Sequence, residues 1–222
     1  MRTRETIRNL LPKRVLELRR RFYWWRHDRP RPGRTRRAIE RLLARGGPIR
    51  LELGSGSRPA MPGWTSVDLH AAADIQHDLT KPLPLPDASV DAIYSSHMLE
   101  HFTYPHPMLE LLRDCHRVLK PGAPLKIAVP NARLFLDAYL APSSFDREKF
   151  CSYPVGLHYT SRIDVVNFIA YLGGEHRFMF DEENLPRVLE EAGFREARIR
   201  KFDPSIDLEV RRHESLYAEA VK

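Results

Sequence analysis

The sequence predicts an α/β protein of the doubly wound type, and three observations support this fold class. A short apolar run at 49–53 is followed by the tight turn Gly54-Ser55-Gly56 and then by a second short strand. Glycine allows the sharp turn that lets backbone approach a ligand at the end of a strand. Further apolar runs alternate with helical patterns along the chain, which is typical of a parallel sheet. With 222 residues, the chain is large enough for one domain with a substantial core.

The second strand ends at Asp68, and this acid indicates a nucleoside ligand. A carboxylate at the tip of the second strand can accept hydrogen bonds from both hydroxyls of a ribose. A dinucleotide fingerprint would continue to a third glycine, but Arg58-Pro59 occupies that place. We therefore expect an adenosine that carries no pyrophosphate.

The charge is divided unevenly between the two parts of the chain. Residues 1–50 contain 17 basic and 4 acidic residues, whereas residues 51–222 contain 19 basic and 25 acidic residues. Two cysteines are too few for a disulfide framework, and no signal peptide or long apolar run is present. These features predict a mildly acidic domain with a basic arm, in a reducing, cytoplasmic compartment.

The basic arm, residues 1–46, is expected to be helical and amphipathic. Apolar residues recur every three or four positions from Ile7 to Trp25, and a second helix is expected from Thr35 as N-cap to Gly46, with Ile39, Leu42 and Leu43 inward. Three interpretations remain open: packing on the chain's own domain or on a second subunit, attachment to the inner face of an anionic membrane, or binding of nucleic acid, which basic charge alone supports least.

The remaining elements follow in order. Asn131 and Asp181 are expected to cap helices, and Gly193 to end one. Only Pro59 to Trp64 separates the first turn from the second strand, too short for a crossover helix. Strands are expected at 73–79, 90–96, 125–129, 196–202 and 215–221, and helices at 107–119, 131–139 and 181–192.

Residues 141–177 show no regular pattern and predict an insert or lid over the site. A structureless loop of this length in a compact domain is usually functional. His158 and His176 lie in this insert and are further candidates for the chemistry.

The motifs LELGSGS, SVDL, DIQHDLTKPLPLPDASVDAIYSSHMLEHF, RVLKPG, LKIAVPN and EEAGF occur in this order. Their succession resembles class I S-adenosylmethionine-dependent methyltransferases of the type-eleven kind, over residues 49–222. A looser likeness points to members associated with cell-surface glycan enzymes. The resemblance implies a Rossmann-like seven-stranded sheet, mostly parallel with the last strand antiparallel, in a domain spanning residues 47–222.

The resemblance also implies a cofactor, S-adenosylmethionine, and a binding site for it. Glu52, Gly54 and Gly56 are expected beside its amino-acid part, Asp68 at the ribose, and Asp78 with Leu79 at the adenine. A guanidinium suits a carboxylate, so Arg58 is a candidate partner for the methionine carboxylate. The complete set of expected cofactor residues is Glu52, Gly54, Ser55, Gly56, Arg58, Asp68, Leu69, Asp78, Leu79, Ser95 and Ser96.

In an open parallel sheet, ligands bind at the carboxyl ends of the strands where the strand order reverses, here between the first and fourth strands. Ser95, Ser96, His97 and His101 follow the fourth strand and are expected under the methyl group. A histidine can remove the proton of a hydroxyl acceptor near neutral pH, so His97 and His101 are the catalytic candidates. No metal is expected.

The leading function is methylation of a small molecule or glycan, with oxygen as the expected acceptor atom. A nucleic-acid methyltransferase is the alternative that the basic arm favours, although the base-methyltransferase signatures Asn/Asp-Pro-Pro-aromatic and Pro-Cys are absent. A dehydrogenase is disfavoured by the missing third glycine. A non-catalytic cofactor-binding adaptor at a membrane is the fourth possibility.

Overall fold

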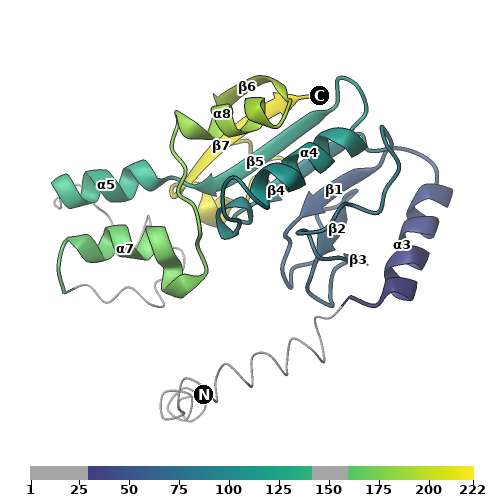
Figure 1. Ribbon diagram of the computed structural model, residues 1–222, viewed down its shortest axis with the longest axis horizontal. Coiled ribbons are helices and arrows are strands. Elements are labelled where there is room, and N and C mark those ends of the chain that lie inside the picture. Colours follow the sequence, from purple (N-terminus) through teal and green to yellow (C-terminus); the bar gives the residue numbers. More distant parts are fainter. Residues whose placement is uncertain (1–29, 142–159) are drawn as a thin grey trace, which may run out of the picture.

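The computed structural model describes residues 30–141 and 160–222. The predicted first helix of the arm, with Ile7 to Trp25, and the part of the insert that contains His158 lie outside these residues. The described part forms one sheet with helices around it (Figure 1).

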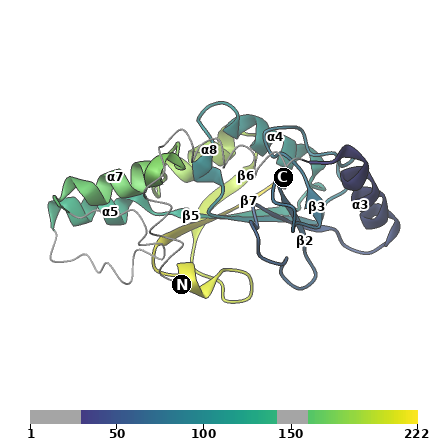
Figure 2. The same cartoon turned by 90° about the horizontal axis from the view of Figure 1, so that it is seen from below.

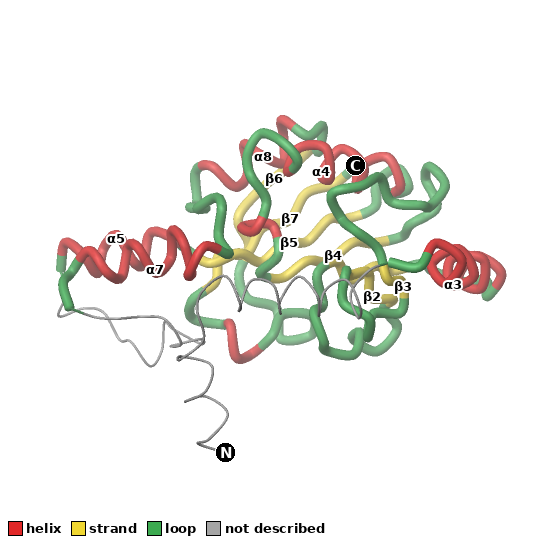
Figure 3. The backbone as a smooth tube through the Cα atoms, turned by 60° about the horizontal axis from the view of Figure 1, so that its bottom comes forward, coloured by secondary structure: helices red, strands yellow, loops and turns green. Residues whose placement is uncertain are grey.

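The sheet has seven strands in the order β3-β2-β1-β4-β5-β7-β6. Pairing is parallel from β3 to β5, whereas β7 is antiparallel to both β5 and β6. This confirms the predicted fold class and its antiparallel last strand. Figure 3 shows the strands, in yellow, as one continuous sheet. Their bounds are β1 Arg50–Leu53, β2 Thr65–Asp68, β3 Ile75–Gln76, β4 Ala92–Ser96, β5 Pro124–Pro130, β6 Arg195–Arg200 and β7 Ser215–Val221.

Two helices cover the same face of the sheet, α4 (Met108–Val118) and α8 (Asn184–Glu191) (Figure 2). The inward face of α4 follows helical spacing, with Met108, Leu111 and Cys115 fully buried. Asp181 caps the turn before α8 by accepting hydrogen bonds from the backbone N–H groups of Glu183 and Asn184. The regular helix therefore begins three residues later than expected.

Helix α3 (Pro32–Ala44) begins before the predicted N-cap. Proline needs no N–H partner in a first helical turn, so Pro32 starts the helix and Thr35 lies inside it. The Thr35 hydroxyl donates to the carbonyl of Gln76 on β3 at 2.7 Å. Ile39 and Leu42 join the core as predicted, but Leu43 is 41% exposed, which corrects the expectation for that residue. This part of the arm therefore packs on the chain's own domain.

Helices α5 (Ala132–Leu140) and α7 (Ile163–Tyr171) lie side by side and extend away from the sheet (Figures 1 and 2). The Asn131 side chain caps α5 as predicted, accepting from the Arg133 N–H at 2.9 Å. Phe135, Val165 and Ile169 form a small separate core between the two helices. The end of the predicted irregular insert is thus helical, because its apolar residues have this second core to fill.

The connection from β1 to β2 contains no helix, as its length predicted. The reversal of strand order leaves β1 beside both β2 and β4, with Leu53 opposite Val67 and Ser95. In residues 30–141 and 160–222, no helix is long and apolar enough to cross a bilayer.

Candidate active site

Two adjoining cavities lie at the carboxyl ends of β1, β2 and β4. The larger has a volume of about 620 Å³ and the smaller about 360 Å³. Both are lined by Gly54, Asp68, Met98 and His101, so these four residues mark the junction between the cavities. This is the place at which doubly wound sheets bind ligands.

The glycine turn after β1 is required by close contact with the loop after β4. Gly54 has φ +78°, and a Cβ there would lie 2.3 Å from Cγ of Met98. The next glycine, Gly56, has φ +62° and donates its N–H to Oδ2 of Asp68 at 2.8 Å. The turn therefore has no space for a side chain at its first glycine, and its second glycine is tied to the second strand.

Asp68 lies at the end of β2, as predicted, and lines both cavities. Its Oδ1 accepts from the His70 N–H at 2.7 Å, while its Oδ2 accepts from Gly56. A carboxylate oxygen can accept more than one hydrogen bond, so the fixed carboxylate still has acceptor capacity toward the cavities. This arrangement fits the two hydroxyls of a ribose.

Leu69, Asp78 and Leu79 line the larger cavity on the side of β2 and β3. Oδ1 of Asp78 accepts from the N–H and the hydroxyl of Thr80, at 3.0 and 2.7 Å, which fixes this carboxylate at the cavity wall. Two apolar side chains with one oriented carboxylate suit a purine that carries an exocyclic amino group.

Glu52 and Arg58 form a pair under the glycine loop. The buried Glu52 carboxylate accepts from Nη2 of Arg58 at 2.8 Å and from the Met61 N–H at 3.0 Å. Arg58 also lines the smaller cavity, with 37% of its side chain exposed. The Arg58 guanidinium thus pairs with Glu52 and also lines the smaller cavity.

The three serines of the predicted set differ in position. Ser55 lines the smaller cavity. Ser95 and Ser96 are buried and line neither cavity, because Arg211 lies over the end of β4 and donates to the carbonyl and hydroxyl of Ser96. In this structure the two strand-end serines lie behind the wall and do not form the expected floor.

His97 lines the smaller cavity with its side chain 10% exposed, and its backbone has φ +53°. Its Nε2 lies 2.7 Å from the Ser215 hydroxyl, and its Nδ1 lies 3.9 Å from Glu214 and 4.0 Å from Glu100. Burial, and then the nearby positive charge of Arg211, lower the pKa of His97 well below its ordinary value. The ring is therefore neutral at neutral pH.

His101, Glu100 and His176 form a second cluster beside the cavity junction. The His101 ring packs edge-on against that of His176, with centroids 5.2 Å apart. Both carboxylate oxygens of Glu100 are buried and have no hydrogen-bond partner in the described part of the chain. Burial raises the pKa of Glu100 to about 8, and burial lowers the pKa of His176.

Sequence reasoning missed Glu100, Met98 and Arg211. Glu100 lies between the two predicted histidines, and an acid within an apolar run was a usable signal. Arg211 belongs to the short 3-10 helix η5 (Glu209–Arg211), more than a hundred positions away from Ser96, so no local pattern could predict this contact.

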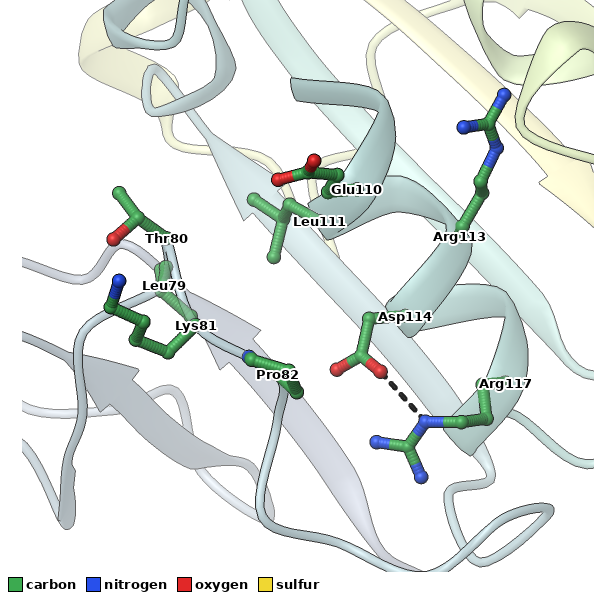
Figure 4. A pocket seen from close by; sticks show the side chains of 9 residues that line it. All are labelled: Leu79, Thr80, Lys81, Pro82, Glu110, Leu111, Arg113, Asp114 and Arg117. Atoms are coloured by element: carbon green, nitrogen blue, oxygen red, sulfur yellow. Dashed lines mark hydrogen bonds and ion pairs between the residues drawn. The ribbon is translucent and has the colours of Figure 1, made fainter. Parts of the chain in front are cut away.

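A third cavity, of about 420 Å³, lies between α4 and residues 79–82 (Figure 4). Arg117 there donates to Asp114 at 2.7 Å and also to the carbonyls of Leu83 and Leu85. These bonds hold the proline-rich connection against α4, so the polar groups of this cavity have a structural role.

Comparison with known proteins agrees with the site. Residues 64–127 match the family described as "Methyltransferase domain". A "Probable S-adenosylmethionine-dependent methyltransferase" of Mycolicibacterium smegmatis is 37% identical over 62 residues, which are 28% of this chain and 23% of that protein. The match thus spans less than a quarter of the relative's length.

Solved structures with a similar chain trace include two methyltransferases. A SAM-dependent methyltransferase from Archaeoglobus fulgidus has a TM-score of 0.48 at 19% identity, covering 86% of this chain and 92% of that chain. One from Mesorhizobium loti has a TM-score of 0.46 at 20% identity, covering 85% and 95%.

The sheet order is that of a doubly wound α/β fold, and residues 64–127 within it are similar to a methyltransferase domain. This partial similarity supports S-adenosylmethionine as the cofactor.

Proposed function

We propose that this chain transfers a methyl group to a hydroxyl oxygen of a small molecule or glycan. The observation that carries this proposal is the position of His101 at the junction of the two cavities. A proton acceptor is needed there only if the methyl acceptor must lose a proton, as a hydroxyl must.

The chain's own residues bind and orient the cofactor. Asp68 accepts from the ribose, Leu69 and Leu79 enclose the adenine, and Arg58 faces the smaller cavity, where the methionine carboxylate would lie. The bound cofactor supplies a methyl group on a positively charged sulfur, ready for in-line displacement. The protein contributes by holding the acceptor in line with that methyl group.

His101 has the hydrogen-bond pattern of a proton acceptor. Its Nδ1 lies 3.0 Å from the carbonyl of Glu175, and a carbonyl only accepts, so the ring proton is on Nδ1. Nε2 therefore carries a lone pair. The ring is 38% exposed and lines both cavities, so an incoming hydroxyl can approach it.

His97 acts as a positioning residue in this proposal. Its Nε2 is engaged by Ser215, and its backbone N–H donates to Ala128 on β5 at 2.8 Å. These contacts fix the loop that carries Met98 and His101. Loss of His97 should therefore disturb the site without removing the proton acceptor.

An assay with labelled cofactor and a fractionated cell extract tests the function. We expect label in hydroxyl-bearing small molecules or glycans, and a loss of about a hundredfold in turnover for His101→Ala with cofactor affinity unchanged. His106→Gln is the control, because His106 is 64% exposed and lines neither cavity. Label in RNA would favour the nucleic-acid alternative, and cofactor binding without transfer would favour the adaptor.

The basic arm is proposed to dock on an anionic membrane surface or a second subunit through residues 1–29. The supporting observation is the excess of basic residues in the first 50 positions together with the apolar repeat from Ile7 to Trp25. Flotation with anionic liposomes and size-exclusion chromatography, each with and without residues 1–29, distinguish the two. If neither result changes on removal, both forms of docking are excluded.

A further inference from the structure

We propose that Glu100, His101 and His176 bind a divalent transition-metal ion of the Zn²⁺ type at the edge of the larger cavity. The three side chains offer one carboxylate oxygen and two imidazole nitrogens. Their ligand atoms all lie within 4.8 Å of one another. This departs from the expectation, drawn from the sequence, that the chain holds no metal.

The distances suit a shared ion. Oε1 of Glu100 lies 3.9 Å from Nε2 of His101 and 4.0 Å from Nε2 of His176. Tetrahedral zinc bonds of about 2.0–2.2 Å place ligand atoms roughly 3.4 Å apart. A contraction of roughly 0.5 Å, within the range of side-chain torsions, would bring Glu100 to coordinating distance with each histidine.

The tautomers of the two histidines are set by backbone carbonyls. Nδ1 of His101 lies 3.0 Å from the Glu175 carbonyl, and Nδ1 of His176 lies 2.7 Å from the Ile169 carbonyl. Each Nδ1 therefore donates, and each Nε2 presents a lone pair. Metal-binding histidines are oriented in the same way, by a carbonyl or carboxylate that accepts from the nitrogen opposite the metal.

With Glu100 ionised, the cluster consequently holds three acceptors and no donor. Glu100 is 2% exposed, and neither of its carboxylate oxygens has a hydrogen-bond partner within residues 30–141 and 160–222. A buried carboxylate without a partner is costly, and a cation between the three acceptors would remove that cost. Such an ion would satisfy the lone pairs of both imidazoles and of the carboxylate together.

The fold holds the ligands in place from two distant segments. Glu100 and His101 lie on η2 (Leu99–His101), directly after β4, and His176 follows η4 (Leu172–Gly174). The backbone N–H groups of Arg177 and Phe178 donate to the Glu100 carbonyl at 2.8 and 3.2 Å. The two segments are thus joined beside the ligands.

The donor set selects the class of ion. Imidazole nitrogen suits Zn²⁺ and its transition-metal neighbours, whereas Mg²⁺ and Ca²⁺ prefer oxygen ligands throughout. Three protein ligands leave a fourth position open on zinc, as in catalytic sites. His101 lines both cavities, so the open position would be at the cavity junction.

The role of the ion rests on the proposed function. A bound Zn²⁺ would coordinate the acceptor hydroxyl and lower its pKa, and the hydroxyl proton would pass to solvent. The oxygen then forms the bond to the methyl carbon as the carbon–sulfur bond breaks, leaving S-adenosylhomocysteine. With the ion bound, His101 is its ligand, and the ion takes over the activation of the hydroxyl.

Metal binding is tested on the full-length protein, purified without a histidine tag and treated with a chelator. Calorimetric titration with Zn²⁺ should show one equivalent bound, and Co²⁺ should give the visible absorption bands of a low-symmetry site. Mg²⁺ should not bind. No binding of Zn²⁺ or Co²⁺ would overturn the proposal.

Two ligand variants and one control locate the site. Glu100→Gln keeps the shape of the side chain but removes its charge, and we expect Zn²⁺ affinity to fall at least about tenfold, as it should for His176→Ala. His106→Gln, at an exposed histidine, should bind Zn²⁺ like the parent chain. Parent-like affinity in Glu100→Gln would contradict the proposal, and this variant is isosteric with the protonated acid, so it should fold.

The outcome is independent of methyl transfer, because the titrations contain neither cofactor nor acceptor. A chain that binds Zn²⁺ here but transfers no methyl group would disprove the proposed function and leave the metal site standing. A chain that methylates a hydroxyl without binding Zn²⁺ would disprove the metal site and leave the proposed function standing.

Discussion

The buried carboxylate of Glu52 on β1 is hydrogen-bonded to the guanidinium of Arg58 at 2.8 Å. Its other oxygen accepts from the Met61 N–H at 3.0 Å. Both contacts hold the connection between β1 and β2, which has no crossover helix to support it. One side chain on a central strand thus fixes the loop that lines the smaller cavity.

Arg58→Ala should destabilise the fold and weaken cofactor binding. The change leaves the buried Glu52 carboxylate without its charged partner, at a cost of about 1.5–3 kcal/mol in the free energy of unfolding. Urea unfolding measures this cost, and calorimetry measures the affinity. Arg36→Ala is the control, because Arg36 pairs with Glu40 at 82% exposure and its loss should leave stability close to that of the parent chain. Equal stability of both variants would show that the buried pair does not support the loop.

Gly54→Ala should cost more than backbone strain alone. Gly54 and Gly122 have nearly the same φ, +78° and +77°, but a Cβ at Gly54 meets Met98, whereas a Cβ at Gly122 meets nothing within 4 Å. Gly122→Ala should therefore lose about 1 kcal/mol. We expect Gly54→Ala to lower the free energy of unfolding by about 1–3 kcal/mol more than Gly122→Ala does, and to bind cofactor weakly. Similar losses of stability in the two variants would show that the contact with Met98 does not add to the cost.

The sequence was sufficient for the sheet because its buried strands are short apolar runs, and Gly54, Asp68 and Pro130 mark the ends of β1, β2 and β5. Asp68 could be placed for the same reason, since a strand of known register ends on it. The start of α3 was missed because Thr35 is a good N-cap in isolation, whereas Pro32 begins the helix and the Thr35 hydroxyl bonds to β3. Tertiary contact thus overrode the local signal.

The candidate site was less predictable, because its parts come from distant segments. The carbonyls that set the tautomers of His101 and His176 belong to Glu175 and Ile169, and no local pattern connects them to β4. The covering of Ser96 by Arg211 is likewise a contact between residues far apart in the chain. Only the fold brings these groups together.

Removal of residues 1–46 should destabilise the domain, whereas removal of residues 1–29 should not disturb the described contacts. The longer deletion takes away α3, in which Thr35, Ile39 and Leu42 are buried. Loss of the two buried apolar side chains Ile39 and Leu42 uncovers the core surface that they contact, which should lower the free energy of unfolding by about 2–5 kcal/mol. Thermal unfolding of the two truncated proteins checks this. If both unfold at the same temperature, α3 is a separate arm and not part of the domain.

Asp91→Asn should lower stability at neutral pH but not in acid. Asp91 accepts from Lys120 and from the Ile49 N–H, each at 2.7 Å, and these bonds hold its pKa below the ordinary value of 3.8. Because the pKa of Asp91 is lower in the folded state than in the unfolded state, the ionised carboxylate stabilises the fold at pH values above its unfolded-state pKa. This stabilisation is lost as the pH falls through the folded-state pKa. We expect a difference of about 1 kcal/mol from the parent near pH 7 that shrinks below roughly pH 4. A difference that is constant across this range would contradict the assignment.

Calorimetric titration of S-adenosylmethionine into the parent chain, Asp68→Ala and Asp74→Ala is the most direct test of the cofactor site. Asp68 at the end of β2 and Asp74 just before β3 each accept two short bonds, but only Asp68 lines the cavities. Asp68→Ala should weaken binding by more than about tenfold, since it leaves both ribose hydroxyls without their charged acceptor. Asp74→Ala should bind within about threefold of the parent. Parent-like affinity in Asp68→Ala would contradict the placement of the cofactor at the end of β2.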